Sequence, residues 1–561
     1  MEIYAVLGVV VLLLLIFYVS GKITEHRRKE YLIHALKDAF GKLPEEDYLA
    51  SDLERIRKYH EKRKEHADKE CFVIDEITWN DLEMDEIFAL FNATQSSPGE
   101  EYLYHILHCM RLNEEENPVS RLSDHFLSND QQRFQIQMIL HKVGKIKQFS
   151  ITDILNYAND LPQEKNLKHY LVDLGILLSA GLIFLNAAVG VLLLVVFLAI
   201  SVISYFHRKA EISPYFTTFF YVIRLLKAAE EILKMEEAAF EAENEDLQKI
   251  VKSCRGFQRS AFFLATGVQF SQNILDILME YIRILFHLDI IKFNSMLRFL
   301  QEHEEDVEQL REIIGRFDAS IGVANARTAM ELAIPEFTSV KTISVENAFH
   351  PLVRKPVPNS IAASSGILIT GSNASGKSTF IKSIALCALL SQTIHVVPAQ
   401  SYKACRVRLV TSMALKDEIT HGESYFVVEI KSLKRIVDLA EEEGQPVLCF
   451  VDEVLRGTNT VERIAASSRI LKSLNRKNAI CFAATHDIEL THILDNEFTN
   501  YHFEEEVVNG DVTFQYRIKD GRSHTQNAIM LLSMIGFDKE TIEDAKEAAA
   551  HFTQTSQWSK I

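Results

Sequence analysis

The stretch ILITGSNASGKST, residues 367–379, decides how the second half of the chain folds. Its first four residues are apolar or β-branched and predict a buried strand, and residues 380–390 predict a helix directly after the loop. Between them lies the spacing G-x-x-x-x-G-K-S, in which glycines allow backbone N–H groups to point inward around a phosphate. The N-terminus of the following helix adds the positive end of its dipole. This order of strand, loop and helix predicts a phosphate-binding loop within an α/β domain.

The residue types in this loop indicate that the ligand is a nucleotide. Lys377 is placed to reach the β- and γ-phosphates, and the Ser378 hydroxyl is placed to bind Mg²⁺. The expected cofactors are therefore ATP and Mg²⁺. A glycine-rich turn that arose by chance is the alternative interpretation. The residues expected to bind the nucleotide are Gly371, Ser372, Asn373, Ala374, Ser375, Gly376, Lys377, Ser378 and Thr379.

Two further apolar runs, VLCFV and AICFAA, predict strands that end in side chains suited to catalysis. The first run leads to Asp452, which we expect to bind Mg²⁺ together with Ser378, and to Glu453, which we expect to orient or deprotonate the attacking water. The second run leads to His486, which we expect to sense the γ-phosphate, with a structural role as the alternative. The strand ends therefore predict a site for ATP hydrolysis with Glu453 and His486 as its catalytic residues.

Length and composition limit what the rest of the chain can be. At 561 residues the chain is too long for one hydrophobic core, so two or three domains are expected. The seven cysteines are scattered, with no C-x-x-C pair and no spacing that suits zinc, which is typical of core thiols in a reducing compartment. A formal net charge of −17 excludes a surface that is basic throughout, although a local groove can still bind phosphates.

Two apolar regions are long enough to enter a membrane. Residues 3–19 form one apolar run, and about 17 to 20 such residues cross a hydrocarbon core of about 30 Å. A cleaved signal peptide is the alternative, but such a peptide has a basic start, and only Glu2 precedes this run. Residues 171–206 have the length of two short spans back to back, with a buried helical hairpin as the alternative.

The basic residues near these regions predict one orientation, because Lys and Arg collect in cytoplasmic loops. They follow residues 3–19 and lie on both sides of residues 171–206, whereas the loop near Asn186 has no charge. We therefore expect a multi-pass protein of the cell membrane, in contact with membrane lipid, whose N-terminus and hairpin tip lie outside and whose ATPase domain is cytoplasmic. The basic residues are Lys22, Arg27, Arg28, Lys29, Lys165, Lys168, Arg208 and Lys209.

The pattern before residue 335 is helical, with few glycines or prolines after residue 206 and no hairpin signals. Apolar residues recur over residues 296–321 at alternating steps of three and four, with His303 at the one missing place. We expect this heptad seam to pack within its own domain. After Pro335, short β-branched runs alternate with helical segments, which is typical of a mostly parallel sheet covered by helices.

The expected fold class is therefore a multidomain protein with an all-α part followed by an α/β part. Its divisions are a transmembrane anchor at residues 1–20, a charged helical juxtamembrane region at 21–70, a helical domain at 71–335 containing the transmembrane hairpin 171–206, an α/β ATPase domain at 336–550 and a tail at 551–561.

The motifs at the three strand ends resemble those of the MutS family, whose ATPase belongs to the ABC class of dimerising P-loop proteins. Residues 370–379 are similar to the family's TGPNxxGKST, residues 451–460 to its LDExxRGTST and residues 484–486 to its ATH. The resemblance implies helical levers that switch with the nucleotide, a homodimer that forms through the ATPase domains, and DNA as a partner in a process related to mismatch repair.

The resemblance extends beyond the strand ends. Residues 349–352 resemble the element that opens the family's ATPase domain, and residues 81–84 resemble the start of its lever domain. Residues 417–429 are similar to the family's loop DDxxxGxSTFxxE. That similarity implies that Gly422 and Ser424 lie in a loop that reaches across the dimer, with Ser424 near the γ-phosphate bound by the other subunit.

Departures from the family pattern leave two hypotheses for what the ATPase acts upon. Before the lever region the sequence has only the expected anchor and the charged juxtamembrane region, so we expect no mismatch-reading domain. Pro356 stands where family members often have the aromatic that stacks on adenine. The first hypothesis is a membrane-anchored ATPase whose levers bind DNA. The second is a membrane-associated interaction or remodelling ATPase with no DNA-binding role. A transporter subunit of the ABC class is a poor fit, because the LSGGQ-type signature is absent from the sequence.

Overall fold

The computed structural model divides the chain into two compact units. The helical unit consists of Met1–Glu65, Asn92–His105 and Arg121–Thr328, and the α/β unit consists of His66–Phe91, Ile106–Ser120 and Ala329–Ile561. The residues that the structure describes are 2–45, 47–64, 71–257, 274–372, 375–413, 425–455, 458–508, 511–523, 529, 532, 536–555 and 557–558.

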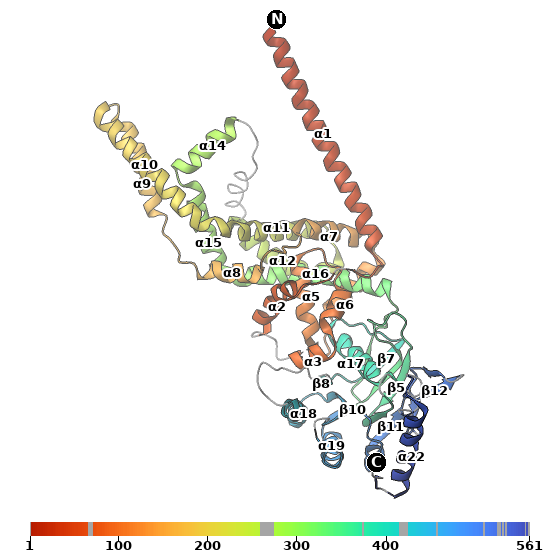
Figure 1. Ribbon diagram of the computed structural model, residues 1–561. Helices are drawn as coiled ribbons and strands as arrows, with labels where there is room; N and C mark the ends of the chain where they lie inside the picture. Colours follow the sequence, from red (N-terminus) through yellow and green to blue (C-terminus); the bar gives the residue numbers. More distant parts are fainter. Residues whose placement is uncertain are drawn as a thin grey trace. The chain divides into compact units, whose positions relative to one another are not determined.

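Long helices make up the helical unit (Figure 1). The first, α1, is continuous over Glu2–Ala39, so the expected anchor and much of the expected juxtamembrane region share one helix. The other helices in this part of the chain are α2 (Ala50–Lys64), α5 (Ser97–His108), α6 (Pro118–Ser128), α7 (Asp130–Val143), α8 (Ile151–Asp160), α9 (Leu167–Leu182), α10 (Ala187–Ile212), α11 (Phe216–Leu233), α12 (Glu241–Ser253), α14 (Ile274–Leu285), α15 (Leu288–Glu302) and α16 (Glu304–Ala329), with 3-10 turns η1 (Ser213–Tyr215) and η2 (Ala238–Phe240).

The heptad seam lies in the core of this unit, which confirms that it packs within its own domain. The seam is nevertheless divided between α15 and α16, because His303 leaves the helical conformation at φ −127° and ψ 34°. The backbone N–H of His303 caps α15 at Phe299 and Leu300, and the His303 ring stacks on Phe299 at 4.0 Å between centroids. The buried seam residues are Met296, Leu300, Val307, Leu310, Ile314, Phe317 and Ile321.

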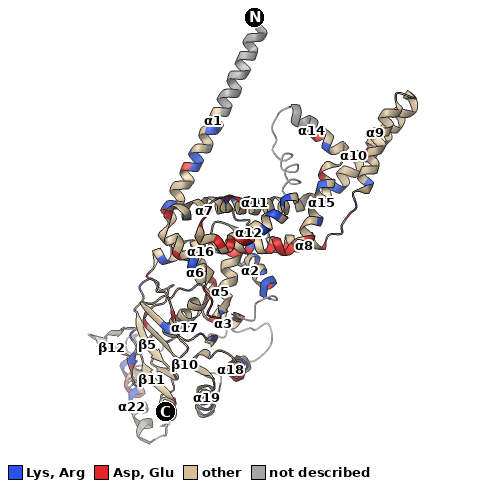
Figure 2. Cartoon of the chain, turned by 180° about the vertical axis from the view of Figure 1, so that it is seen from behind, with Lys and Arg blue, Asp and Glu red and all other residues tan. Residues whose placement is uncertain are grey.

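Helices α9 and α10 form a hairpin whose apolar side chains are exposed. At its tip, Phe184 is 93% exposed and Leu185 is 86% exposed. Helix α10 is long and apolar enough to cross a membrane, and only 11% of its apolar window is buried. Figure 2 shows that the hairpin has few charged residues along its length, whereas charged residues gather on other helices of the helical unit. These exposures do not support the alternative of a buried hairpin.

The α/β unit is built on a six-stranded sheet in the order β14-β11-β6-β10-β9-β8. Every neighbouring pair from β11 to β8 is parallel, and β14 is antiparallel to β11. The six strands are β6 (Gly366–Thr370), β8 (Arg408–Ser412), β9 (Val447–Asp452), β10 (Ala479–Thr485), β11 (Phe498–His502) and β14 (Lys519–Asp520). The sequence therefore predicted the mostly parallel sheet correctly.

Smaller sheets and several helices complete the α/β unit. A four-stranded sheet has the order β3-β7-β4-β5, and β1-β2 and β12-β13 are separate pairs. The strands are β1 (Cys71–Val73), β2 (Cys109–Arg111), β3 (Glu336–Phe337), β4 (Ile343–Ala348), β5 (Asn359–Ala363), β7 (Ser401–Ala404), β12 (Glu505–Val508) and β13 (Asp511–Phe514); the helices are α3 (Glu76–Asp81), α4 (Met84–Phe91), α17 (Lys377–Thr393), α18 (Tyr425–Glu441), α19 (Thr460–Asn475), α20 (Ile488–Ile493) and α22 (Lys539–Thr555).

The α/β unit differs from the expected ATPase domain at residues 336–550 because it includes two segments from much earlier in the chain. His66–Phe91 and Ile106–Ser120 belong to it, although the sequence predicts them in the juxtamembrane region and the helical domain. Side-chain amides join the second segment to α17: Asn117 donates to the Thr393 carbonyl at 2.9 Å, and Gln392 donates to the Arg111 carbonyl at 3.1 Å. Such long-range pairing leaves no local signal in the sequence.

Candidate functional site

Three parallel strands of the α/β unit end at one edge of the sheet. In the register of the sheet, Thr370 of β6 pairs with Thr485 of β10, and Asp452 of β9 pairs with Ala484. The three segments that follow these strands begin at the same level. The topology therefore brings together the phosphate loop, the acidic pair and His486, which are distant in the sequence.

The phosphate loop turns sharply between β6 and α17. Gly371 has φ +145° and Gly376 has φ +105°, values that L side chains rarely adopt. A Cβ atom on Gly371 would lie 2.7 Å from the Phe503 carbonyl oxygen, so the loop also needs glycine there for space. Lys377 Nζ donates to the carbonyls of Gly371 and Ser372, both at 2.7 Å. The ammonium group is therefore folded over the loop, where it is placed to meet phosphate oxygens.

Ser378 and Asp452 supply two oxygen donors at the same point. Ser378 Oγ donates to Asp452 Oδ2 at 2.5 Å, from the first turn of α17 to the last residue of β9. A hydroxyl and a carboxylate are hard oxygen ligands, which Mg²⁺ prefers, and it usually binds through one or two carboxylates together with phosphate oxygens. The pair therefore fits the expected Mg²⁺.

Glu453 and His486 form a pair beside this point. Glu453 Oε1 lies 2.8 Å from His486 Nε2, and His486 Nε2 lies 3.5 Å from Lys377 Nζ. Glu453 has φ +56°, an uncommon conformation for a residue with a side chain, and its N–H donates to the Ala484 carbonyl at 2.9 Å. This turn at the end of β9 places the Glu453 carboxylate against His486.

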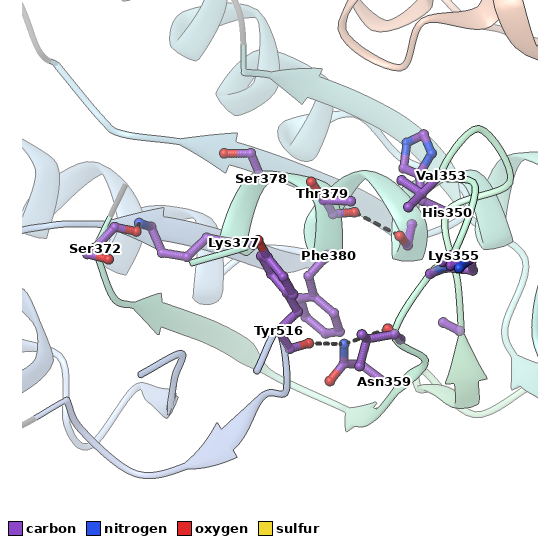
Figure 3. Close-up of a pocket in the computed structure, with 15 residues that line it drawn as sticks. His350, Val353, Lys355, Asn359, Ser372, Lys377, Ser378, Thr379, Phe380 and Tyr516 are labelled. Atoms are coloured by element: carbon purple, nitrogen blue, oxygen red, sulfur yellow. Dashed lines mark hydrogen bonds between the residues drawn. The ribbon is translucent and has the colours of Figure 1, made fainter. Parts of the chain in front are cut away.

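A cavity of about 470 Å³ lies against the phosphate loop and α17 (Figure 3). Tyr516 forms part of its wall, and its ring lies 3.1 Å from where a Cβ atom on Gly376 would be. Asn359 fixes the tyrosine backbone, because its amide donates to the Tyr516 carbonyl at 2.9 Å and its oxygen accepts from the Ile518 N–H at 2.8 Å. Tyr516 is not among the residues predicted from the sequence, because its only local signal is one aromatic residue after the short strand β13.

Other residues of this cavity include one expected from the resemblance. Pro356 lines the wall, at the position where the family often has an aromatic. His350 also lines the cavity and is buried. Burial lowers the pKa of its imidazole below the usual range; the nearby Glu83 carboxylate opposes this shift, and Lys382 adds to it. A neutral histidine at the rim leaves the positive charge of the cavity lining to Lys355 and Lys377.

Four of the expected site residues lie outside the described residues. They are Asn373 and Ala374 of the phosphate loop, and Gly422 and Ser424 of the loop expected to act across a dimer. The other expected site residues lie around one edge of the main sheet, in the phosphate loop and at the ends of β9 and β10.

This arrangement defines a class of protein: an α/β protein with a phosphate-binding loop at the carboxyl edge of a parallel sheet. The family model for MutS domain V matches residues 367–553, which include the loop, the acidic pair and His486. This match and the relatives described next support membership of the MutS family, as the motifs predicted.

Two relatives define how far the similarity extends. The chain is 29% identical over 294 residues to MutS protein homolog 4 of Homo sapiens, which covers 49% of this chain and 31% of that protein. It is 32% identical over 270 residues to the DNA mismatch repair protein MutS of Petrotoga mobilis, which covers 46% of this chain and 32% of that protein. The chain spans about a third of the length of these relatives.

Proposed function

We propose that this chain is a Mg²⁺-dependent ATP hydrolase whose P-loop domain belongs to the ABC class. The observation that carries the proposal is the convergence at one sheet edge of Lys377, of Ser378 with Asp452, and of Glu453 with His486. Mg²⁺ supplies charge neutralisation between the phosphates when it is bound. The chain itself then holds the phosphates with Lys377 and orients the attacking water with Glu453, so that catalysis consists of positioning and charge stabilisation.

The cavity beside the loop provides space for the base of the nucleotide. Tyr516 and Pro356 both line this cavity, and the Tyr516 ring lies beside the turn at Gly376. Stacking of aromatic rings adds about 0.5–1.5 kcal/mol to simple burial. We propose that the Tyr516 ring stacks on the adenine base, in place of the aromatic that family members often have at the position of Pro356.

We also propose that two copies join through their ATPase domains and that the nucleotide state moves the helical unit. Gly422 and Ser424 then complete the site of the other copy, as the family resemblance implies. DNA is the proposed partner, because one relative is named a DNA mismatch repair protein. The second candidate is a membrane-associated interaction or remodelling ATPase with no DNA-binding role, which the formal net charge of −17 favours.

The proposed location is the cell membrane, with the ATPase domain in the cytoplasm. The apolar run at residues 3–19 and the exposed apolar faces of α9 and α10 support contact with lipid. Lys22, Lys168 and Lys209 lie at the ends of these segments, as expected for cytoplasmic loops.

Glu453→Gln tests the hydrolytic role of the site. The amide keeps the shape of the side chain but removes the carboxylate, so we expect kcat to fall by about 100-fold or more while ATP binding is kept. The measurement is phosphate release and equilibrium binding of ATP with the detergent-solubilised full chain. Glu540→Gln, which changes an exposed glutamate on α22, is the control. Normal turnover by Glu453→Gln would remove this residue from the mechanism.

The same assay distinguishes the two candidate partners. The rate is measured with duplex, mismatched and branched DNA, and with lipid vesicles, across a salt series. Stimulation by DNA that weakens with salt supports the DNA-binding role, because phosphate contacts release counterions. Stimulation by vesicles together with indifference to DNA supports the second candidate.

A further inference from the structure

Strand β8 is the last strand in the order of the main sheet, and α3 hydrogen-bonds to it. An edge strand has backbone N–H and C=O groups without a neighbouring strand, and proteins cover such edges with other elements. Here the covering element comes from more than 300 residues earlier in the chain, since Thr78 bonds Thr411 across 333 positions.

Thr411 is fully buried, and α3 and α18 satisfy its three polar groups. Its N–H donates to Thr78 Oγ1 at 3.2 Å, and its hydroxyl donates to Asp81 Oδ2 at 2.7 Å. Its carbonyl accepts from Arg435, which also donates to Asp75 at 2.6 Å. Because Asp75 caps the N-terminus of α3, the helix is tied at both ends to this one threonine and its neighbours.

Asp81 also fixes the end of β8 beside the metal-binding carboxylate. Its Oδ2 accepts from the Met413 N–H at 2.9 Å, one residue beyond the strand. Ser412 pairs with Val451 in the parallel register, and Val451 directly precedes Asp452. A buried carboxylate that accepts two hydrogen bonds is therefore what holds the chain next to Asp452.

The next residues of the same segment hold the helix that follows the phosphate loop. Glu83 Oε1 pairs with Lys382 Nζ at 2.8 Å, and Lys382 lies on α17, whose first turn contains Lys377 and Ser378. Glu83 has φ +54°, so the chain makes a tight change of direction between the contact to β8 and the contact to α17.

We propose that residues 75–83 form a positioning clamp for the catalytic site, with Asp81 as its central residue. The clamp holds β8, and through it the end of β9, at a fixed distance from α17, so that the Asp452 carboxylate stays within reach of the Ser378 hydroxyl. This proposal rests on the proposed ATP hydrolysis. The clamp continues through α4 into Asn92–His105 of the helical unit, so it is also a covalent route by which the nucleotide state reaches that unit.

The test is Asp81→Ala in the full detergent-solubilised chain, with rates expressed per ATP-binding site. Partners that orient metal ligands typically change metal affinity or activity by 10–100-fold. We expect kcat to fall about tenfold, the KM for ATP to stay within about twofold, and the Mg²⁺ concentration needed for half-maximal ATP binding to rise about tenfold. Asp81→Asn is expected to recover most of these losses, because its amide oxygen can accept from both Thr411 and Met413.

Two further variants keep the test decisive. Thr411→Val removes the donor hydroxyl but keeps the side-chain shape, and is expected to shift the Mg²⁺ dependence in the same direction by a smaller factor, even if Asp81→Ala does not fold. Glu86→Gln, which changes an exposed side chain on α4 outside residues 75–83, is the control and should leave the Mg²⁺ dependence unchanged.

The clamp would be overturned if neither Asp81→Ala nor Thr411→Val changed the Mg²⁺ dependence. If Asp81→Ala cannot be purified, an unchanged Mg²⁺ dependence in Thr411→Val would overturn it. Equal loss in Asp81→Asn and Asp81→Ala would also overturn it. Failure of the unaltered chain to hydrolyse ATP would instead contradict the proposed function, while the Mg²⁺ dependence of ATP binding would still report on the clamp.

Discussion

Helices α17 and α10 are both rich in apolar residues, but protein covers only one of them. In α17, every residue over 383–393 is buried in the α/β unit. In α10, the buried residues are Gly190, Ser201, Tyr205 and Ile212, whereas Leu192 is 64% exposed and Ile203 is 71% exposed. Composition alone therefore does not distinguish a core helix from one that needs a partner outside the protein.

The difference shows what the hydrophobic effect requires in each place. Burial of apolar area contributes roughly 25 cal/mol per Å² only where that area leaves water. The sheet provides this burial for α17, while the α9–α10 hairpin leaves a continuous apolar surface uncovered. Large exposed apolar patches mark membrane or protein contacts. A charge placed in α17 should therefore destabilise the fold, whereas charges placed in α10 should weaken lipid binding and leave the fold stable.

The largest effect is expected from Leu386→Glu in α17. Leu386 is 0% exposed, so the substitution places an unpaired charge in the core and is expected to lower the free energy of unfolding by more than about 4 kcal/mol. Chemical denaturation and ATP binding measure the loss, and Leu386→Met, which conserves volume, is the control. A stable, ATP-binding Leu386→Glu chain would contradict the burial of α17.

A charge pair in the hairpin should change lipid contact rather than folding. Leu192→Glu combined with Val195→Glu alters two exposed positions, so stability in detergent should change by less than about 0.5 kcal/mol per site. In liposomes, a tryptophan introduced at the tip by Phe184→Trp should be quenched by lipids with brominated acyl chains, and the charge pair should abolish this quenching. Tyr157→Trp on α8 is the control that should not be quenched. Absence of quenching in the Phe184→Trp chain would contradict insertion of the hairpin, and equal quenching with and without Leu192→Glu and Val195→Glu would contradict the role of this apolar face in lipid contact.

A smaller effect is expected where the two helices of the hairpin touch. A Cβ atom on Gly175 would lie 2.4 Å from the Phe197 ring, whereas nothing lies within 4 Å of one on Gly181. Gly175→Ala should separate the helices and cost about 1–3 kcal/mol locally, which hydrogen exchange of the α9 amides can measure. The matched Gly181→Ala should slow exchange instead, because alanine favours helix by about 1 kcal/mol over glycine. Identical exchange in the two variants would show that the helices are not in contact.

The sequence predicted the parts of the site whose chemistry is local. The phosphate loop, Asp452 with Glu453, and His486 each follow an apolar run, and parallel strands bring such ends to one edge without further information. The predicted mostly parallel sheet was confirmed, and the match of residues 367–553 to MutS domain V supports the predicted family. The membrane segments and the loop at Gly422 and Ser424 remain predictions.

The missed features depend on contacts between distant residues. Tyr516 reaches the cavity through a bond from Asn359, across 157 positions, and no spacing rule links the two. Asp81 contacts Thr411 across 330 positions. The break at His303 was visible only as one polar residue in a heptad seam, because both helices keep the same buried stripe on either side of it.

The interleaving of the two units has a consequence for how the chain is made. Residues 66–91 leave the ribosome long before residues 408–412 exist, so the α3 segment must wait for most of the chain before it meets β8. During that interval its apolar residues, including Trp79, Leu82 and Ile87, lack the surroundings that later bury them. Incomplete chains of this kind are prone to aggregate. A fragment that starts at residue 336 would inherit the complementary defect, an uncovered strand at the border of its sheet, and would need residues 66–120 supplied alongside it to become soluble.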